Sequence, residues 1–357
     1  MKKPTVISLF SGCGGLDLGF RQSGYHIIWA NDILPDACKT YHINIGGHII
    51  CGDINNIKKS IIPKSDMVIG GPPCQSFSLV GKRNPADKRS NMIWSYLEVL
   101  EKIKPKLFLL ENVTGILSAQ NSDGSKVLDN LIEAFNDKGY QTSIIKLNAA
   151  DYGIPQKRIR VFIVGSKKNI IVPAPKKITA EEDWVNAFEA LSDLSDTTET
   201  GSGQYISKPK NKFQEMMRAG QNGSFDLHYT PHASKKDQEL INLIPPGGNY
   251  MNVPDEVATK RILNFKKTGG RTTTYGRLSK DKPSYTLNTH FNRLNVGCNI
   301  HYDKNRLISL REGLRIQSFP DSFTIFSSNK RNYYVQVGNA VPPLLGKAWA
   351  DHLLNYL

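Results

Sequence analysis

Short apolar runs alternate with helix-like patterns through the first half of the chain. Five runs predict buried parallel strands, each ending in or beside a Gly, Asp, Asn or Glu: residues 5–10, 27–31, 48–52, 66–69 and 107–110. Between them, apolar residues recur at helical spacing over residues 16–23, 35–45, 92–103 and 127–138. Repeated strand–helix units predict an α/β fold with a doubly wound sheet, whose functional site lies at the carboxyl ends of the strands.

The pattern changes in the second half. Two further strands are predicted at 142–147 and 160–164, around a turn with Gly153 and Pro155, and the regular alternation then stops. We therefore expect one domain made of residues 1–170 plus 325–357 and a smaller, loop-rich domain at 171–324. The stretch 266–280 carries five cations and no acid, which fits either a solvated loop or a loop that contacts nucleic acid.

Composition narrows the class of partner. The 357 residues include 46 Lys and Arg against 32 Asp and Glu, a net charge of +14 that favours an anionic partner such as nucleic acid. No apolar run approaches the ~18 residues of a membrane span, and the apolar start is too short for a signal peptide. Five cysteines without metal-ligand spacing predict a reduced, cytoplasmic protein without a metal site.

A glycine-rich turn follows the first strand: Phe10-Ser11-Gly12-Cys13-Gly14-Gly15-Leu16-Asp17. Glycines let a backbone approach a ligand closely, but Asp17 replaces the last glycine of a dinucleotide motif and would repel a pyrophosphate. A ligand with cationic groups and no phosphate, such as S-adenosylmethionine, fits better. Asp32, at the end of the second strand, could accept hydrogen bonds from ribose hydroxyls, and Asp53 would lie near an adenine amino group. The alternative role for either acid is a helix cap.

Three further features suggest a reacting centre. Cys74 follows Pro72-Pro73, a stiff turn at a strand end, and its thiolate would be a nucleophile. Glu111 closes an apolar strand, where partial burial would raise its pKa and make it a proton donor. Alternation predicts that Gln156, Arg158 and Arg160 share one face of a strand, where guanidinium groups could polarise a carbonyl. Surface salt bridges are the alternative for these arginines. The other four cysteines, Cys13, Cys38, Cys51 and Cys298, are interpreted as inert packing.

These residues lie in blocks by which the chain resembles the bacterial DNA (cytosine-5) methyltransferases over nearly its full length. The blocks, in the family's order, are Ser8-Leu9-Phe10-Ser11-Gly12-x-Gly14-Gly15, Gly70-Gly71-Pro72-Pro73-Cys74-Gln75-Ser76-Phe77-Ser78, Glu111-Asn112-Val113, Gln156-x-Arg158-x-Arg160, Arg311-Glu312-x-x-Arg315-x-Gln317-x-Phe319-Pro320-Asp321 and Val337-Gly338-Asn339-Ala340-Val341-Pro342.

The resemblance implies a Rossmann-like S-adenosylmethionine-dependent methyltransferase domain and a loop-rich target-recognition domain. It implies that Cys74 adds to C6 of a cytosine flipped out of double-stranded DNA, and that Glu111 protonates N3. Arg160 would hold the cytosine O2, and Arg158 would support the thiolate and the nearby backbone. The activated C5 would then take the methyl group from S-adenosylmethionine.

The resemblance also places the binding residues. Cofactor contacts are expected at Phe10, Ser11, Gly12, Gly14, Gly15, Leu16, Asp32, Ile33, Asp53, Ile54, Pro72, Asn339 and Ala340. DNA contacts are expected in a loop that closes over the base, at Ser76, Ser78, Val80, Lys82 and Arg83. The recognition domain would add Arg271, Tyr275, Arg277, Thr286, His290, Asn292 and Arg293.

A transfer-RNA cytosine methyltransferase would share the same catalytic core, although the long basic insertion favours DNA. A binding module without catalysis would lack Cys74 or Glu111, and an NAD-dependent dehydrogenase would leave Pro72-Pro73-Cys74 unused. We expect a monomer, serving a restriction-modification system with a separate endonuclease or acting as an orphan methylase.

Overall fold

The computed structural model describes residues 3–73, 92–121, 123–221 and 223–357. The chain divides into two compact units, and each is described by itself. The first unit comprises Met1–Asn148, Ile159–Lys176 and Leu345–Leu357, and the second comprises Ala149–Arg158 and Lys177–Leu344. The second unit includes the segment before Arg158 because that segment pairs with a strand more than a hundred residues later. The assignment of target recognition to residues 171–324 stays a prediction.

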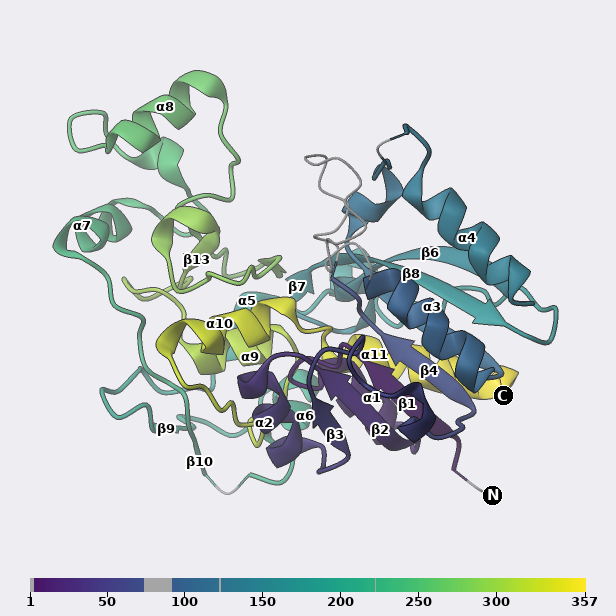
Figure 1. Ribbon diagram of the computed structural model, residues 1–357. Coiled ribbons are helices and arrows are strands. Elements are labelled where there is room, and N and C mark those ends of the chain that lie inside the picture. The colour runs from purple at the N-terminus through teal and green to yellow at the C-terminus, as the bar shows by residue number, and fades with distance from the viewer. Residues whose placement is uncertain (1–2, 74–91, 122, 222) are drawn as a thin grey trace. The chain divides into compact units, whose positions relative to one another are not determined.

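The first unit is built on a seven-stranded sheet in the order β3-β2-β1-β4-β5-β8-β6 (Figure 1). The strands are β1 Thr5–Leu9, β2 His26–Asp32, β3 Ile49–Cys51, β4 Met67–Gly70, β5 Leu107–Asn112, β6 Gln141–Asn148 and β8 Ile159–Ser166. Strands β1 to β5 are parallel, whereas β8 runs antiparallel to both β5 and β6. The sheet confirms the predicted α/β, doubly wound class, and the strand order reverses beside β1 and β4, where such sheets bind ligands.

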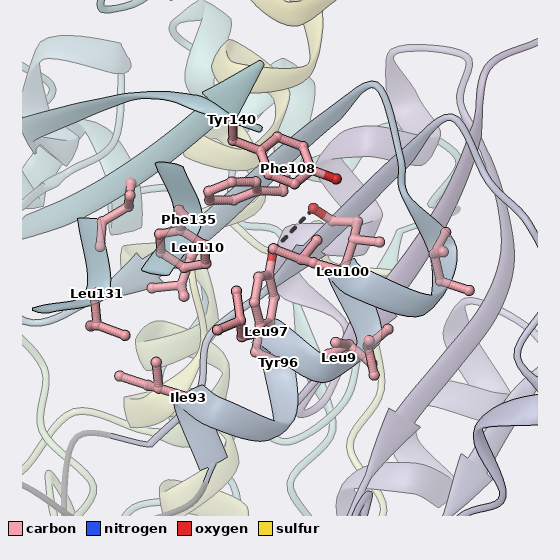
Figure 2. Close-up of a cluster of buried hydrophobic side chains, with 14 of the residues drawn as sticks. Leu9, Ile93, Tyr96, Leu97, Leu100, Phe108, Leu110, Leu131, Phe135 and Tyr140 are labelled. Atoms are coloured by element: carbon pink, nitrogen blue, oxygen red, sulfur yellow. Dashed lines mark hydrogen bonds between the residues drawn. The ribbon is translucent and has the colours of Figure 1, made fainter. Parts of the chain in front are cut away.

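The helices of this unit are α1 Gly15–Gln22, α2 Pro35–Asn44, α3 Met92–Ile103 and α4 Val127–Asp137, together with most of α11 Pro343–Leu353. Helices α3 and α4 cover one face of the sheet, where Tyr96, Phe108, Phe135 and Tyr140 form a buried cluster (Figure 2). Phe108 lies 4.5 Å from Phe135 between ring centroids, and the Tyr96 hydroxyl donates to the Val68 carbonyl at 3.1 Å. A Cβ on Gly165 would lie 2.0 Å from the Phe108 ring, so only glycine fits there. This packing holds the ends of β4 and β5 in place.

The second unit is loop-rich, as predicted, and its strands are short. Its helices are α5 Ala187–Leu191, α6 Lys212–Arg218, α7 Lys235–Leu243, α8 Lys260–Thr268, α9 Leu310–Ile316 and α10 Lys330–Asn339. Its strands pair two by two: β9 Gly203–Gln204 with β10 Ser224–Phe225, β11 Gly276–Arg277 with β13 Cys298–Ile300, and β12 Ser284–Tyr285 with β7 Gln156–Lys157. Because such short strands form few backbone hydrogen bonds with each other, side-chain contacts must hold much of this unit together.

Buried charges supply part of that stability. The Arg315 guanidinium lies between the carboxylates of Asp193 and Asp321, and all three side chains are fully buried. Arg311 donates instead to the carbonyls of Asp226 and Phe323. A buried arginine requires such partners, because an unpaired charge in the interior is strongly destabilising. Much of the Arg311–Asp321 block is therefore structural.

Candidate active site

The carboxyl ends of β4 and β5 bring the first two catalytic blocks together. Gly70 pairs with Leu110, so the residues after β4 continue beside Glu111. A Cβ on Gly71 would lie 3.0 Å from Glu111 Oε2, and the Asn112 side-chain amide donates to the Pro72 carbonyl at 3.1 Å. The chain that leads to residue 74 is therefore held against the glutamate. Cys74 and the predicted loop contacts Ser76, Ser78, Val80, Lys82 and Arg83 lie outside the described residues.

Glu111 forms an ion pair with Arg160. Arg160 Nε lies 3.0 Å from Glu111 Oε1, and each side chain is only 12% exposed. Strand β8 runs antiparallel to β5, so the arginine reaches the end of β5 from the neighbouring strand. Burial lowers the pKa of Arg160, and the Glu111 carboxylate opposes that effect. An acid and a cation thus share one edge of the sheet.

Arg158 occupies a different environment from Arg160. Strand β7 ends at Lys157 and β8 begins at Ile159, and between them the Arg158 N–H donates to the Gln156 carbonyl at 3.0 Å. The expectation that Gln156, Arg158 and Arg160 share one face of a strand is therefore wrong, because this bond turns the chain at Lys157, and Gln156 and Arg160 belong to different strands.

The Arg158 guanidinium, 1% exposed, donates to three backbone carbonyls of the second unit. The acceptors are Leu287 at 3.1 Å, Gly338 at 2.9 Å and Ala340 at 3.1 Å. Arg158 therefore connects the Thr286-Leu287 segment to the last block. Its predicted support of the thiolate stays a prediction.

Two glutamines extend this connection. Gln156 Oε1 accepts from the Leu287 N–H at 3.0 Å, and its Nε2 donates to Gln317 Oε1 at 2.9 Å. Gln317 Nε2 then donates to the Val337 carbonyl at 2.6 Å. Segments around residues 156, 287, 317 and 338 are thereby joined within the second unit. The sequence placed both glutamines in blocks but could not show that they bond to each other.

The predicted cofactor turn is organised by Asp32. Its Oδ2 accepts from the Gly12 N–H at 2.8 Å and its Oδ1 from the Leu34 N–H at 2.9 Å, just before α2. Burial raises the pKa of Asp32. Gly12 has a φ of +56°, and a Cβ there would meet no atom within 4 Å, so open space borders the turn. Ile33 beside it is 57% exposed, an unusual position for an isoleucine.

The remaining predicted cofactor contacts differ in exposure. Phe10, Ser11, Asp53 and Ala340 are partly exposed, and Asn339 is exposed. Gly14, Gly15, Leu16, Ile54 and Pro72 are buried, so they shape the turn and the strand ends from within. Asp53 Oδ1 accepts from the Asn55 N–H at 2.9 Å, which closes a local turn.

Asp17 does not face a ligand. Its side chain has no exposed surface, its Oδ2 accepts from the Ser8 hydroxyl at 2.9 Å, and its Oδ1 accepts from the Tyr41 hydroxyl at 2.8 Å. Burial raises the pKa of Asp17 to about 6. The interpretation that Asp17 could tolerate or attract a cationic ligand is wrong, because Tyr41 of α2 and Ser8 of β1 enclose the carboxylate.

The second unit contains a cleft of about 500 Å³ that gathers part of the predicted DNA surface. It is lined by Lys157, Arg271, Thr273, Tyr285, Thr286, Asn288, Thr289, His290, Val296, Gly297 and Cys298. The lining has two cations and no acid. Burial lowers the pKa of His290, as do the nearby cations Arg293 and Arg331, so its ring is neutral near pH 7.

Lys157 and Tyr285 are among the lining residues that sequence reasoning missed. Lys157 was visible inside the Gln156-x-Arg158 block, and Tyr285 precedes Thr286 with a ring that is 52% exposed. The Thr286 hydroxyl donates to the Lys157 carbonyl at 2.8 Å, which joins the two sides of the cleft. Two other predicted contacts lie outside the lining: Asn292 is half-buried and Arg293 is exposed.

Two predicted DNA contacts are corrected by burial. Arg277 is 4% exposed, and all five of its N–H groups donate to the carbonyls of Ile241, Ile244, His301 and Lys304 and to the Asn305 side chain. No donor remains for a base or a phosphate. Tyr275 is also 4% exposed and packs in the core with Ile241 and Ile300. Both residues stabilise the unit from inside.

In the part of the chain that the structure describes, neither a helix that could span a membrane nor a cluster of metal-binding side chains is present. No helix there is long and apolar enough to cross a membrane. In the same residues, no group of three or more His, Cys, Asp or Glu side chains could hold a metal ion.

Comparison with known proteins places this geometry in a family. The model of a family described as C-5 cytosine-specific DNA methylase matches residues 4–355. The chain is 35% identical to the Type II methyltransferase M.DdeI of Desulfomicrobium norvegicum, over 98% of this chain and 88% of the relative. It is 34% identical to M.NgoFVII of Neisseria gonorrhoeae, over 96% of this chain and 84% of the relative.

Solved structures agree with the fold. A prophage-encoded protein from E. coli, assigned as a DNA modification methyltransferase, matches with a TM-score of 0.76 and 26% identity over 99% of both chains. The Dnmt2 methyltransferase of S. pombe matches with a TM-score of 0.61 over 99% of both chains. At 18% identity, the second likeness concerns the fold alone.

Proposed function

This chain belongs to the C-5 cytosine-specific DNA methylase family and is a DNA cytosine-C5 methyltransferase, and we propose that it acts through a covalent bond between Cys74 and C6 of a flipped-out cytosine. The observation that carries this mechanism is the Glu111–Arg160 pair, which lies against the Gly71-Pro72 segment just before Cys74. A nucleophile, an acid and a cation are the groups that addition to a pyrimidine ring requires.

The proposed reaction begins when the Cys74 thiolate adds to C6. Negative charge then develops over the ring, and Glu111 neutralises it by delivering a proton to N3 while Arg160 donates to O2. The electron-rich C5 takes the methyl group, which S-adenosylmethionine supplies from its sulfonium. A base, which a water molecule can supply, then takes the C5 proton as Cys74 leaves as the thiolate, and N3 returns its proton to Glu111, which restores the aromatic ring. Covalent addition replaces one difficult step with several easier ones.

The family implies use of S-adenosylmethionine, and the residues of the first unit fit it. The Asp32 carboxylate, which backbone N–H groups hold in place, can accept ribose hydroxyls with its remaining lone pairs. Open space beside Gly12 leaves room for the ligand, and the exposed Ile33 offers an apolar surface to the adenine. Asp53 and, in the second unit, Asn339 and Ala340 remain predicted contacts.

The substrate is DNA rather than transfer RNA, as the family description and the Type II relatives support. We propose that the cleft of the second unit contacts it, with Lys157 and Arg271 on phosphates or base edges and Tyr285 and His290 on base edges. The exposed Arg293 and the half-buried Asn292 remain predicted contacts outside the cleft. We further propose a cytoplasmic monomer that acts apart from any restriction endonuclease.

The reaction is tested by incubating plasmid DNA with the protein and S-adenosylmethionine, followed by bisulfite sequencing. We expect 5-methylcytosine in one fixed sequence context. Methylation of transfer RNA and not of plasmid would overturn the proposal. The Cys74→Ser variant should not form a covalent complex with DNA that contains 5-fluorocytosine, whereas the matched Cys51→Ser variant should.

The cleft is tested by measuring DNA affinity against salt concentration. Lys157→Met or Arg271→Met should weaken binding and, if the cation contacts a phosphate, reduce the salt slope by about one. Lys236→Met removes an equal charge from the exposed face of α7 and should leave both quantities unchanged. Equal effects of all three variants would mean that net charge, and not the cleft, binds DNA.

A further inference from the structure

Two cysteines meet beside Asp32, in the first unit. Cys51 is the last residue of β3 and pairs in register with Asp32 of β2, and its side chain is exposed. Cys38 lies on α2 and is 6% exposed. The expectation that these cysteines are inert packing therefore does not hold for Cys51, which reagents in solution can reach.

Both cysteines lie near one backbone carbonyl, that of Asp32. Cys38 Sγ donates to the Asp32 carbonyl oxygen at 3.3 Å, and the Gly52 N–H, next to Cys51, donates to that oxygen at 2.9 Å. The two thiols are close enough to interact as hydrogen-bonding groups, and burial raises the pKa of the Cys38 thiol. Cys13 also lies near Asp32, but it is fully buried and its pKa is raised to about 12.

We propose that Cys38 and Cys51 form a redox-sensitive thiol pair that closes to a disulfide under peroxide and thereby weakens binding of the cofactor. The consequence for the cofactor rests on the proposed function, whereas closure of the pair does not. Disulfides in reducing compartments are usually transient and redox-sensing, which fits a pair with one accessible thiol and one buried one.

The chemistry needs only a peroxide as oxidant. The exposed Cys51 thiolate attacks one oxygen of hydrogen peroxide, the O–O bond breaks, and a sulfenic acid and one water form. The Cys38 sulfur, after losing its proton, attacks the Cys51 sulfur and displaces the hydroxyl as a second water. Two thiols are oxidised and one peroxide is reduced. Because the pKa of Cys38 is raised, the second step should be faster in alkaline than in neutral solution.

Closure would act directly on the cofactor site. The Asp32 carbonyl would lose its S–H donor, and β3 would be tethered to α2 at the point where the chain continues to Gly52 and Asp53. The Asp32 carboxylate is positioned by the backbone N–H of Leu34, just before α2, so a shift of α2 or β3 moves this acid. We expect a several-fold rise in the Kd for S-adenosylmethionine.

The test uses the full chain carrying Cys74→Ser, so that oxidation of the nucleophile does not interfere. The protein is treated with hydrogen peroxide and digested, and mass spectrometry is used to look for a Cys38–Cys51 linked peptide. Binding of S-adenosylmethionine is measured by calorimetry before oxidation, after oxidation and after reduction with dithiothreitol. We expect the linked peptide, weaker binding and full reversal. Adding Cys38→Ser or Cys51→Ser should abolish the response, whereas adding Cys298→Ser, in the second unit, should preserve it.

The outcomes separate the two proposals. Absence of the linked peptide, or a linked peptide with unchanged cofactor affinity, overturns the redox inference. A reduced protein that does not bind S-adenosylmethionine at all contradicts the proposed function, even if the disulfide forms.

Discussion

At the scale of residues, the guanidinium of Arg160 pairs with a carboxylate, whereas those of Arg158 and Arg277 donate to backbone carbonyls. All three arginines lie in basic or motif-like segments, so their sequence context alone does not separate them. The partner distinguishes the roles: Arg160, beside Glu111, is the arginine that we propose contacts the substrate, and Arg277 donates to five acceptors within the second unit. Asp17 bonds to two enclosing side chains, whereas Asp32, although also buried, bonds to the backbone of Gly12, which open space borders.

Glu111→Gln should lower the rate of methyl transfer by about 10²–10⁴-fold, the usual contribution of a general acid. The amide can still accept a hydrogen bond from Arg160, so the fold should persist while the transferable proton is lost. Single-turnover transfer from labelled S-adenosylmethionine measures the effect. Glu98→Gln, on the exposed part of α3, is the matched control, and equal rates for both variants would remove Glu111 from the mechanism.

Arg277→Met should reduce the free energy of unfolding by about 3–5 kcal/mol, because it leaves five acceptors without their donor, and the bonds to Ile241, Ile244 and His301 are buried. Arg271→Met, six residues earlier and exposed, should change stability by less than about 0.5 kcal/mol. Urea unfolding distinguishes the two. A stable Arg277→Met protein with weakened DNA binding would restore the original prediction that Arg277 contacts DNA.

At the scale of elements, two kinds of packing position the site. In the first unit, the aromatic cluster under α3 and α4 holds the strand ends that carry Glu111 (Figure 2). In the second unit, the short strands β7 and β12 pair over only two residues each, and side chains such as Arg158, Gln156 and Gln317 complete the connection. The first arrangement follows from regular hydrophobic burial, and the second depends on individual hydrogen bonds.

Gly338→Ala tests the second arrangement. A Cβ there would lie 2.5 Å from the Asn288 carbonyl oxygen and 2.6 Å from the Thr289 nitrogen, so two backbone segments would have to separate. We expect a loss of about 2–3 kcal/mol in the free energy of unfolding and weaker binding of DNA at the adjoining cleft. Gly115→Ala, whose Cβ would meet only Val113 at 3.8 Å, should be tolerated; the opposite ranking in thermal unfolding would refute the explanation.

At the scale of the whole molecule, charge acts in two ways. The net charge of +14 favours association with DNA at long range, and added salt should weaken this association. Inside the second unit, Glu312 bonds to Arg306 and lies 3.7 Å from His301. Burial opposes protonation of His301 and lowers its pKa to about 4.

The low pKa of His301 predicts that the free energy of unfolding falls in acid. The pKa of His301 is about 6.5 in the unfolded protein and about 4 in the folded protein. The neutral ring's contribution to the free energy of unfolding is therefore fully present above pH 6.5 and is lost as the pH falls to 4. The loss should be about 3 kcal/mol, measured by urea unfolding across that interval. His301→Asn should flatten the dependence, whereas His232→Asn, at an exposed site, should not. An unchanged slope in His301→Asn would assign the acid sensitivity to other groups.

The sequence by itself determined the doubly wound sheet, because strands and helices with one buried face leave periodic apolar patterns that can be counted. It also determined the family, through six blocks in order, and it placed Glu111 and Asp32 at strand ends. Only the tertiary structure decided which side chains meet: Glu111 with Arg160, Arg158 with Leu287 and Gly338, Asp17 with Tyr41, and Cys38 with Cys51. The reason is physical, since burial and hydrogen bonding depend on partners that are distant along the chain, and no local pattern records where those partners lie.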